Sequence, residues 1–480
     1  MEKYDLIIIG AGPSGLALAQ CISKLKKKIL IVEKENVIGG CHRVRRVNGY
    51  FTEHGPRIYS STYKVFDKLL KEMNVEFNEL FKEYNFTITQ IGGETIFTTL
   101  EWRELILFGI ELFKLMINRN TGMDKSMEEF IKNNNFKKES IEIIDRVCKL
   151  TDGGGIEKYT LNQFLQLFNQ QILHKLYQPN KPLDEGLFKI WKEYLEKNGV
   201  EFYLETEIDE IKIENEKIEN IKIKKNNNNV IIKGEKYVFA IPPKNLNDIV
   251  KQYNIKNDWG NLEKFSKETE YIDYISVTFH WDKKLELNKV YGFPRTEWGL
   301  AYIVLSDYME FNEEKSKTVI STAVTISDKK SKNNNKTANE CNNEELLKEM
   351  LYQLRQSFPE IPDPSISIIS PGVKYNENEK KYKSIDTAFI SNSKEGFLQY
   401  KNNIITNMYN LGTHNGNSYY KFTSLESAVS NSVKLSKILY KELNNKKYIE
   451  LEKSLEISDI FDVVLLILII YFIYIIIKNE

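Results

Sequence analysis

Runs of apolar residues at the beginning of the chain predict a strand, a helix and a second strand. Leu6–Ile9 is apolar and mostly β-branched, and it is too short for a helix, so it predicts a buried strand of a parallel sheet. Leu16–Leu25 predicts a helix, and Lys28–Val32 is a second apolar run that predicts a strand. The order of these elements is that of a βαβ unit.

Farther along, helical and strand-like blocks alternate, which predicts an α/β fold with two interleaved domains. Residues 1–75, 186–250 and 396–445 are assigned to a discontinuous Rossmann-like domain, and residues 76–185 and 251–395 to an α+β domain. The helices predicted in these blocks are Glu101–Met116, Ser126–Asn133, Leu187–Asn198 and Glu344–Phe358. The predicted strands are Val200–Leu204, Lys217–Lys224, Val230–Lys233, Lys236–Pro243, Tyr271–Trp281, Trp298–Leu305 and Thr318–Ile326. Alternation in the Tyr271 strand directs one face to a core and the other to solvent or a cavity.

Three glycines follow the first strand with the spacing G-x-G-x-x-G. The first glycine permits a tight turn, the second lets a pyrophosphate approach the backbone, and the third lets the helix pack on the strand. A phosphate would then lie at the positive end of the helix. The weaker alternative is that the glycines only allow the βαβ unit to pack, without a nucleotide. The residues predicted to contact the cofactor at this turn are Gly10, Ala11, Gly12, Pro13, Ser14 and Gly15.

An acidic residue, Glu33, ends the second strand and is followed by Lys34. It lies about 20 residues after the glycines, where a carboxylate accepts hydrogen bonds from a ribose 2′-hydroxyl. A carboxylate there disfavours a 2′-phosphate. The sequence therefore predicts FAD or NAD rather than NADP.

A second pair of glycines, Gly39–Gly40, follows the acid and precedes the segment Tyr50–Arg57. An NAD-binding fold does not need this pair, whereas it would let the chain lie against a longer cofactor. Together these motifs resemble the FAD-dependent amine oxidase superfamily, which includes amine oxidases, protoporphyrinogen oxidases and carotene desaturases. The resemblance implies FAD. Covalent attachment is not expected, because no cysteine lies near Gly412.

The resemblance also implies further contacts with FAD. They are made to the diphosphate by Gly39, Gly40 and Arg43, beside the flavin ring by Gly55, Pro56 and Arg57, at the adenine end by Ile208, at the ribityl chain by Gly412 and Thr413, and at the flavin pyrimidine by Leu425 and Glu426. A solvated surface position is the alternative for Arg43. The chain departs from the family at Cys41, at Ser427 and at Ser276, which stands where a flavin-facing lysine is expected. Simple amine oxidation is therefore disfavoured.

Charge and cysteine usage exclude other functions. The chain has 67 Lys and Arg residues and 67 Asp and Glu residues, so no net field attracts nucleic acid. Its 4 cysteines show neither a C-x-x-C pair nor a metal-ligand spacing, which favours free thiols in a reducing compartment and no metal site. The first strand begins so early that no signal peptide is expected before it.

The last apolar segment, Val463–Ile477, is uninterrupted and lies beyond a charged linker at 446–459. Residues 460–477 are predicted to anchor the protein in a membrane with its body in the cytosol; a docking helix or partner-binding tail is the alternative. Within the helical block, Trp102, Phe108 and Phe113 could line an apolar substrate cavity, but core positions are favoured.

The predicted function is an FAD-dependent oxidoreductase that transfers a hydride from a small organic molecule to N5 of the flavin, with an apolar substrate left open. One alternative is an isomerase, because Gly39–Gly40 and His54–Tyr59 also resemble UDP-galactopyranose mutase. Such an enzyme would need several arginines for its sugar nucleotide, and few are available beyond Arg57. The other alternative is a flavin-binding protein without turnover.

Overall fold

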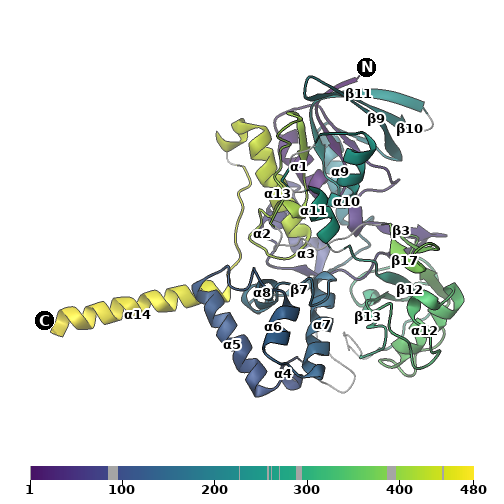
Figure 1. The fold of residues 1–480 in the computed structure, drawn as a ribbon. Helices are drawn as coiled ribbons and strands as arrows, with labels where there is room; N and C mark the ends of the chain where they lie inside the picture. The colour runs from purple at the N-terminus through teal and green to yellow at the C-terminus, as the bar shows by residue number, and fades with distance from the viewer. Residues whose placement is uncertain are drawn as a thin grey trace.

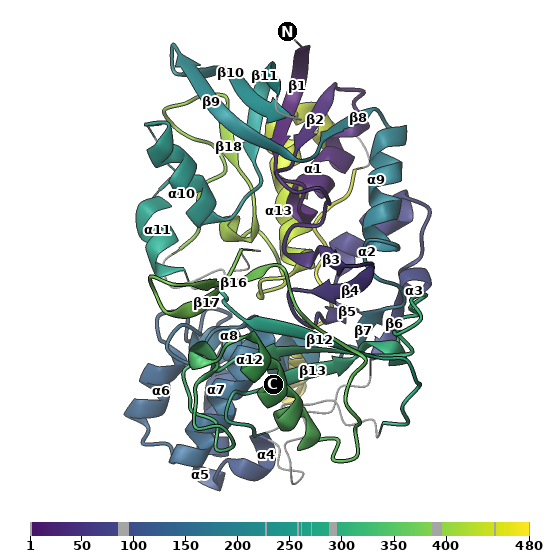
Figure 2. The same cartoon turned by 90° about the vertical axis from the view of Figure 1, so that its right-hand side faces the viewer.

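The computed structural model describes residues 2–84, 96–225, 228–256, 259–260, 262–269, 271–287, 295–385, 396–445 and 448–479. The body consists of two stacked parts, with one sheet above and a second sheet and a group of helices below (Figure 2). Helix α14 (Ile457–Asn479) projects from the lower part into the surroundings (Figure 1). Segments 85–95 and 386–395 of the predicted substrate domain lie outside the described residues.

The upper sheet has the strand order β8-β2-β1-β11-β10-β9, and β18 pairs with the last residues of β11. Strands β8, β2, β1, β11 and β18 run parallel, whereas β9, β10 and β11 are antiparallel neighbours. Chain segments far apart in sequence therefore build one sheet. Its strands are β1 (Glu2–Ile9), β2 (Ile29–Val32), β8 (Val200–Tyr203), β9 (Thr206–Glu214), β10 (Lys217–Lys225), β11 (Asn228–Phe239) and β18 (Met408–Asn410).

Both faces of the first strands are buried, as their continuous apolar runs predict. Leu6 and Ile8 belong to one core, and Ile7 and Ile9 belong to another, because successive side chains point to opposite faces. The first core also contains apolar residues of α1 (Pro13–Ser23), α2 (Lys64–Glu72), α9 (Leu187–Lys197) and α13 (Leu425–Leu439). The second contains those of α10 (Pro243–Gln252) and α11 (Leu262–Glu268).

Strand β11 differs from its prediction. The sequence predicts separate strands at Val230–Lys233 and Lys236–Pro243, whereas the structure has one strand through Phe239. Gly234 stays within the strand because the tyrosine three residues later supports it: the Gly234 N–H donates to the Tyr237 hydroxyl at 2.7 Å. The missing side chain also admits Ile7, whose Cδ1 would lie 3.0 Å from a Cβ on Gly234.

The lower sheet has the order β13-β14-β12-β15 and is covered by α12 (Asn343–Arg355). Every residue of β12 is buried, so the expectation of a face toward solvent is wrong, because β4 and β17 also pack against this strand. The alternative, a face toward a cavity, is met by Ile272 and Tyr274 of the predicted strand, which line the cavity described below. The helices beside the sheet form a separate core. The strands and helices of this part are β12 (Ile275–Trp281), β13 (Ala301–Val304), β14 (Thr318–Val324), β15 (Ile366–Ile369), α4 (Ile96–Thr99), α5 (Trp102–Ile117), α6 (Met127–Asn133), α7 (Lys138–Asp152) and α8 (Leu161–Gln171).

Short strands connect the two parts. β3 pairs with β4, β5 and β6 pair with β7, and β16 pairs with β17. In β4, the Thr52 hydroxyl lies 3.0 Å from the Thr278 hydroxyl of β12, so the segment that leads toward the predicted flavin position is fixed against the lower sheet. These strands are β3 (Val44–Val47), β4 (Tyr50–Glu53), β5 (Tyr59–Ser60), β6 (Phe81–Tyr84), β7 (Leu176–Pro179), β16 (Val373–Asn376) and β17 (Lys381–Ser384), and the short helix α3 spans Phe77–Leu80.

Candidate functional site

One cavity of about 1240 Å³ extends from the upper sheet into the lower part of the molecule. All but four of the residues predicted to bind the cofactor line it, although they come from segments spread over most of the chain. The residues that line it are Gly10, Gly12, Pro13, Ser14, Glu33, Lys34, Gly40, Arg43, Gly55, Pro56, Arg57, Ile208, Gly412, Thr413 and Leu425. The four that do not are Ala11, Gly15, Gly39 and Glu426, and each makes a structural contact described below.

The glycine turn opens the N-terminus of α1 to the cavity. Pro13 is the first residue of the helix, and the first turn carries no acidic side chain, which keeps this positive end free for a phosphate. A Cβ on Gly15 would lie 2.1 Å from the Gly10 carbonyl oxygen, so only glycine lets the helix pack this closely. Gly10 has φ +108°, a conformation that side chains disfavour.

The second glycine pair meets the first at backbone distance. Gly40 has φ +57°, and a Cβ on it would lie 3.0 Å from Gly12 Cα. Gly39 precedes the lining residue Gly40 but does not line the cavity itself. Its N–H donates to the Ala11 carbonyl at 2.8 Å, which joins the two turns. The two turns therefore touch through their backbones at the helix N-terminus, and the glycines leave a wall of the cavity there that a diphosphate could approach closely.

Glu33 lies at the end of β2 and is only 6% exposed. Its Oε2 accepts a hydrogen bond from the Ala11 N–H at 2.8 Å, and its Oε1 lies 3.3 Å from Arg43 Nη2. The proposed surface position of Arg43 is thus wrong, since its side chain is 5% exposed. Glu33 still lines the cavity, as a ribose ligand must. Ile208 of β9 also lines it, and Thr206, two residues earlier, donates its N–H to the Glu33 carbonyl.

The segment His54–Arg57 also lines the cavity and contacts the lower sheet. The Ser276 hydroxyl donates to the His54 carbonyl oxygen, so the residue at the expected lysine position supports this segment instead. Arg57 Nη2 donates to the Cys41 carbonyl at 2.5 Å. Burial, and then the Arg57 charge, hold the pKa of His42 well below its usual range, so His42 is neutral there.

Helix α13 begins beside the same region. Ser424 is its N-cap, and its hydroxyl accepts from the Ser427 N–H at 3.1 Å. The Glu426 carboxylate turns away from the cavity and accepts from the Val65 and Phe66 N–H groups, at 2.9 and 3.0 Å, which caps α2. Leu425 lines the cavity and Glu426 does not, so the first turn of α13 does not offer its acid to a ligand.

The lower end of the cavity is mainly apolar and aromatic. Its walls come from many elements, so no periodic pattern in the sequence marks these residues together, and the sequence interpretation missed them. Burial raises the pKa of Tyr302 in this wall to about 12, which keeps its hydroxyl protonated. The wall residues include Tyr84, Ile96, Phe97, Val147, Leu167, Phe168, Ile172, Leu176, Tyr274, Tyr302, Ile303, Tyr420 and Phe422.

The positions predicted for Trp102 and Phe113, in a cavity wall or a core, are wrong. Trp102 and Phe113 neither line the cavity nor lie in a core, because they are 82% and 55% exposed. Phe108 packs against the helical core, as favoured. Within the described part of the chain, no group of three or more His, Cys, Asp or Glu is placed to hold a metal ion, and the four cysteines are free.

Comparison with known proteins shows the family to which the chain belongs. The family model described as "Flavin containing amine oxidoreductase" matches residues 13–371. A chloroplastic/chromoplastic 15-cis-phytoene desaturase from Glycine max is 20% identical over 321 residues, which cover 60% of this chain and 55% of the desaturase. The chain thus spans about half the length of that curated relative. A UDP-galactopyranose mutase from Mycoplasma pneumoniae is 36% identical over 70 residues, only 14% of this chain and 18% of the mutase.

Solved structures show the same fold at low sequence identity. A triple mutant of putrescine oxidase superposes with a TM-score of 0.62 at 12% identity, over 92% of this chain and 99% of the oxidase. An oxidoreductase from Methanosarcina mazei gives a TM-score of 0.60 at 14% identity, over 90% of this chain and 99% of that chain. The upper and lower parts of the body, and not only the βαβ unit, therefore share a fold with these proteins.

Proposed function

The chain belongs to the flavin containing amine oxidoreductase family, and from this premise we propose that it is an FAD-dependent oxidoreductase acting on an apolar organic substrate. Bound FAD supplies the redox chemistry by accepting a hydride at N5 of the flavin ring. The residues of the chain have three tasks: they hold the dinucleotide, orient the substrate and exclude water.

The continuity of the cavity carries this proposal. The same space that is lined by Gly12 and Glu33 at one end is lined by Leu167, Phe168 and Phe422 at the other. A cofactor that begins at the α1 N-terminus therefore points toward an apolar compartment. Apolar walls bind apolar substrate by removing its surface from water, at about 25 cal/mol per Å².

Cationic side chains that could bind a phosphate are few among the described residues that line the cavity. Lys149 lines it, but its ammonium pairs with Asp145 at 2.8 Å. Among the described lining residues, the arginines are Arg43 and Arg57, and these face Glu33 and the Cys41 carbonyl. A sugar nucleotide such as that of UDP-galactopyranose mutase would need more cationic partners than these, so the isomerase is the less supported function.

Anaerobic reduction of the flavin tests the proposal. The full chain, purified in detergent with FAD, is mixed separately with a long-chain amine, a polyene, a porphyrinogen and UDP-galactopyranose, and loss of the visible flavin absorbance is followed. We expect reduction by an apolar compound. Conversion of UDP-galactopyranose by the reduced protein without net oxidation would support the isomerase instead, and bound FAD that no compound reduces would support a non-catalytic protein.

We further propose that α14 anchors this enzyme in a membrane. The helix has 23 residues, which at about 1.5 Å per residue exceeds the ~30 Å hydrocarbon core of a bilayer. Within its candidate span, Ile457–Ile476, Ser458 is buried against the body, but no residue from Asp459 to Ile476 is buried. Burial of one such side chain yields about 1.5–3 kcal/mol, so exposure of the whole span to water would exceed the net stability of a domain.

A cytosolic body is supported by two observations. The four cysteines are free, as expected in a reducing compartment. Arg119 and Lys453 lie at the body end of α14, and cytoplasmic flanks of membrane helices favour such residues. Protease added to intact cells should then leave the body undigested, and digestion would place it on the outer side.

Charge placed in the span tests the anchor itself. Each lysine at the centre of a membrane helix costs about 2.5–3.5 kcal/mol of insertion free energy, so the double variant Leu466→Lys/Ile470→Lys should be extracted by carbonate. The matched control Ile460→Lys lies at the edge of the span and should remain with the membrane. Carbonate extraction of the unaltered full chain would contradict the anchor.

A further inference from the structure

Helix α5 presents a row of large apolar side chains to the outside of the molecule. They recur every three or four residues and therefore share one face of the helix. A helix that is apolar on its inner and outer faces is normally buried on both, and an exposed apolar patch marks a contact with lipid or protein. The exposed fractions are 82% for Trp102, 59% for Ile106, 46% for Ile110, 55% for Phe113 and 66% for Ile117.

This outer face is continuous with the start of α14. The rings of Phe113 and Phe461 lie 5.7 Å apart. Arg119, just beyond α5, pairs with Asp462 at 2.6 Å and donates to the Ser458 carbonyl at 3.2 Å. A bilayer that receives α14 beyond Asp462 would therefore have its surface at the level of α5.

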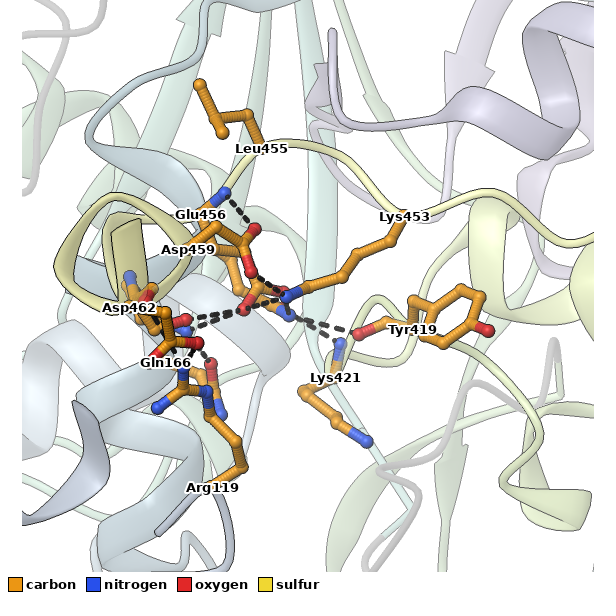
Figure 3. A network of polar contacts seen from close by, with 12 residues as sticks. Arg119, Gln166, Tyr419, Lys421, Lys453, Leu455, Glu456, Asp459 and Asp462 are labelled. Atoms are coloured by element: carbon orange, nitrogen blue, oxygen red, sulfur yellow. Dashed lines mark hydrogen bonds and ion pairs between the residues drawn. The ribbon is translucent and has the colours of Figure 1, made fainter. Parts of the chain in front are cut away.

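A buried polar network fixes α14 to the body (Figure 3). Glu456 is 4% exposed, and its carboxylate accepts from Gln170 Nε2 at 2.6 Å and Asn169 Nδ2 at 2.9 Å, both on α8. Lys453 Nζ lies 3.2 Å from the Glu456 carboxylate and 2.6 Å from Asp459. The residues before α14 thus do not form a free tether, and the direction in which α14 leaves the body is defined.

That direction places α5 against the membrane. Figure 1 shows α14 leaving the body on the side where α5 lies, and α5 running across that side. We propose that the outer face of α5 lies at the boundary between the headgroups and acyl chains of the bilayer that α14 crosses. This inference rests on the membrane anchor proposed above. A protein covering the same face would have to occupy the space beside Asp462 where the bilayer begins, so lipid is the occupant that the geometry favours.

Charges beside the row suit this position. Arg103 and Lys114 of α5 are exposed, although Arg103 Nη2 also donates to the Asn135 carbonyl at 2.7 Å and Lys114 Nζ lies 2.6 Å from Glu111 Oε1. Long basic side chains can extend to lipid phosphates while their methylene groups cover apolar surface, as in helices that lie in the membrane interface.

The chain contains its own reporter for the test. Of its five tryptophans, Trp102 alone is exposed; the others are at most 2% exposed. The full chain with FAD is reconstituted into phosphatidylcholine–phosphatidylserine vesicles whose acyl chains carry bromine near the headgroup. We expect bromine to quench part of the tryptophan fluorescence, and we expect Trp102→Phe to abolish that quenched part.

Charge variants separate contact from mere proximity. Ile110→Glu should reduce Trp102 quenching at least twofold, because a carboxylate opposes burial of the face. Ile231→Glu is the matched control: Ile231 is also 46% exposed but lies on β11, in the other part of the molecule. Its quenching should equal that of the unaltered chain.

Flotation of the same vesicles distinguishes the two proposals. Protein that fails to float with the vesicles overturns the anchor and this inference together. Protein that floats but shows no Trp102 quenching overturns only the α5 contact. Unquenched Trp102 together with a dimer that Ile110→Glu dissociates in detergent would assign the face to a second copy of the chain.

Discussion

The Arg43 guanidinium lies 3.3 Å from the Glu33 carboxylate, and these side chains are 5% and 6% exposed. The ion pair joins the acid assigned to the ribose with the arginine assigned to the diphosphate. Since removing one partner of a buried pair weakens the compensation of the other charge, Glu33 has a structural task besides its predicted contact with the ribose.

Glu33→Gln should weaken FAD binding by about 1.5–3 kcal/mol, the range for a hydrogen bond to a charged group, which is about 10- to 150-fold in Kd. It should also lower the free energy of unfolding, because Arg43 loses the nearer of its two carboxylate partners; the other, Glu35, lies 3.8 Å away. FAD titration of the apoprotein measures the first effect and denaturant unfolding the second. Glu196→Gln is the control, because this carboxylate on α9 is 49% exposed and does not line the cavity. An unchanged Kd in Glu33→Gln would remove Glu33 from the site.

Gly15→Ala should abolish FAD binding or folding. Its Cβ would lie 2.1 Å from the Gly10 carbonyl oxygen, so the strand, the turn or α1 must move. Gly109→Ala is the matched control, because no atom lies within 4 Å of its added Cβ and alanine favours a helix interior by about 0.5–1 kcal/mol. Flavin content after purification measures both, and a yellow Gly15→Ala protein would contradict the close packing.

FAD should be released by acid precipitation of the purified protein. Cys41 is the cysteine among the described lining residues, and it lies beside the glycine turns rather than near Gly412. The supernatant should therefore be yellow. Flavin that remains with the pellet after washing would show a covalent bond.

The free energy of unfolding should fall as pH rises from about 4.5 to 7. Burial raises the pKa of Glu426 to about 7, although two backbone N–H groups and Lys64 act against it. The folded state then binds a proton more tightly than the unfolded state, so stability is highest when Glu426 is protonated and is lost as pH rises through 7. A shift of this size corresponds to about 3 kcal/mol. Burial raises the pKa of Glu53 to about 7 as well, which adds to the same slope.

Glu426→Gln should remove about half of this pH dependence while the exposed Glu442→Gln leaves it intact. Urea unfolding of the full chain in detergent, at a series of pH values, measures the slope. Equal slopes in the two variants would show that Glu426 is not the titrating group.

The sequence predicts the nucleotide end well because each motif there has a local cause. Gly10, Gly12 and Gly15 act within one turn, and Glu33 follows from the length of a βαβ unit. The family and its flavin are confirmed by the matched family model. The continuous β11 was missed because a glycine inside an alternating pattern indicates an interruption, and only the Tyr237 hydroxyl and the neighbouring Ile7 explain its place in the strand.

The substrate end could not be predicted in the same way. Its walls are single residues such as Val147 on α7, Tyr302 on β13 and Phe422 before α13, which only the tertiary structure brings together. The error over Trp102 has a different cause. Its spacing correctly marks one helix face, but a pattern of apolar residues does not tell whether protein or lipid covers that face.

The position of β18 has a consequence for the order of folding. This strand pairs with Tyr237–Phe239 of β11, and the following α13 packs against α1, so the first βαβ unit and the end of the soluble body complete each other. Non-local parallel pairing is slow, because a long loop must close before its contacts form. Until residues 408–439 have left the ribosome, this edge of β11 and this flank of α1 lack their partners, so we expect the nascent chain to need chaperones for most of its synthesis.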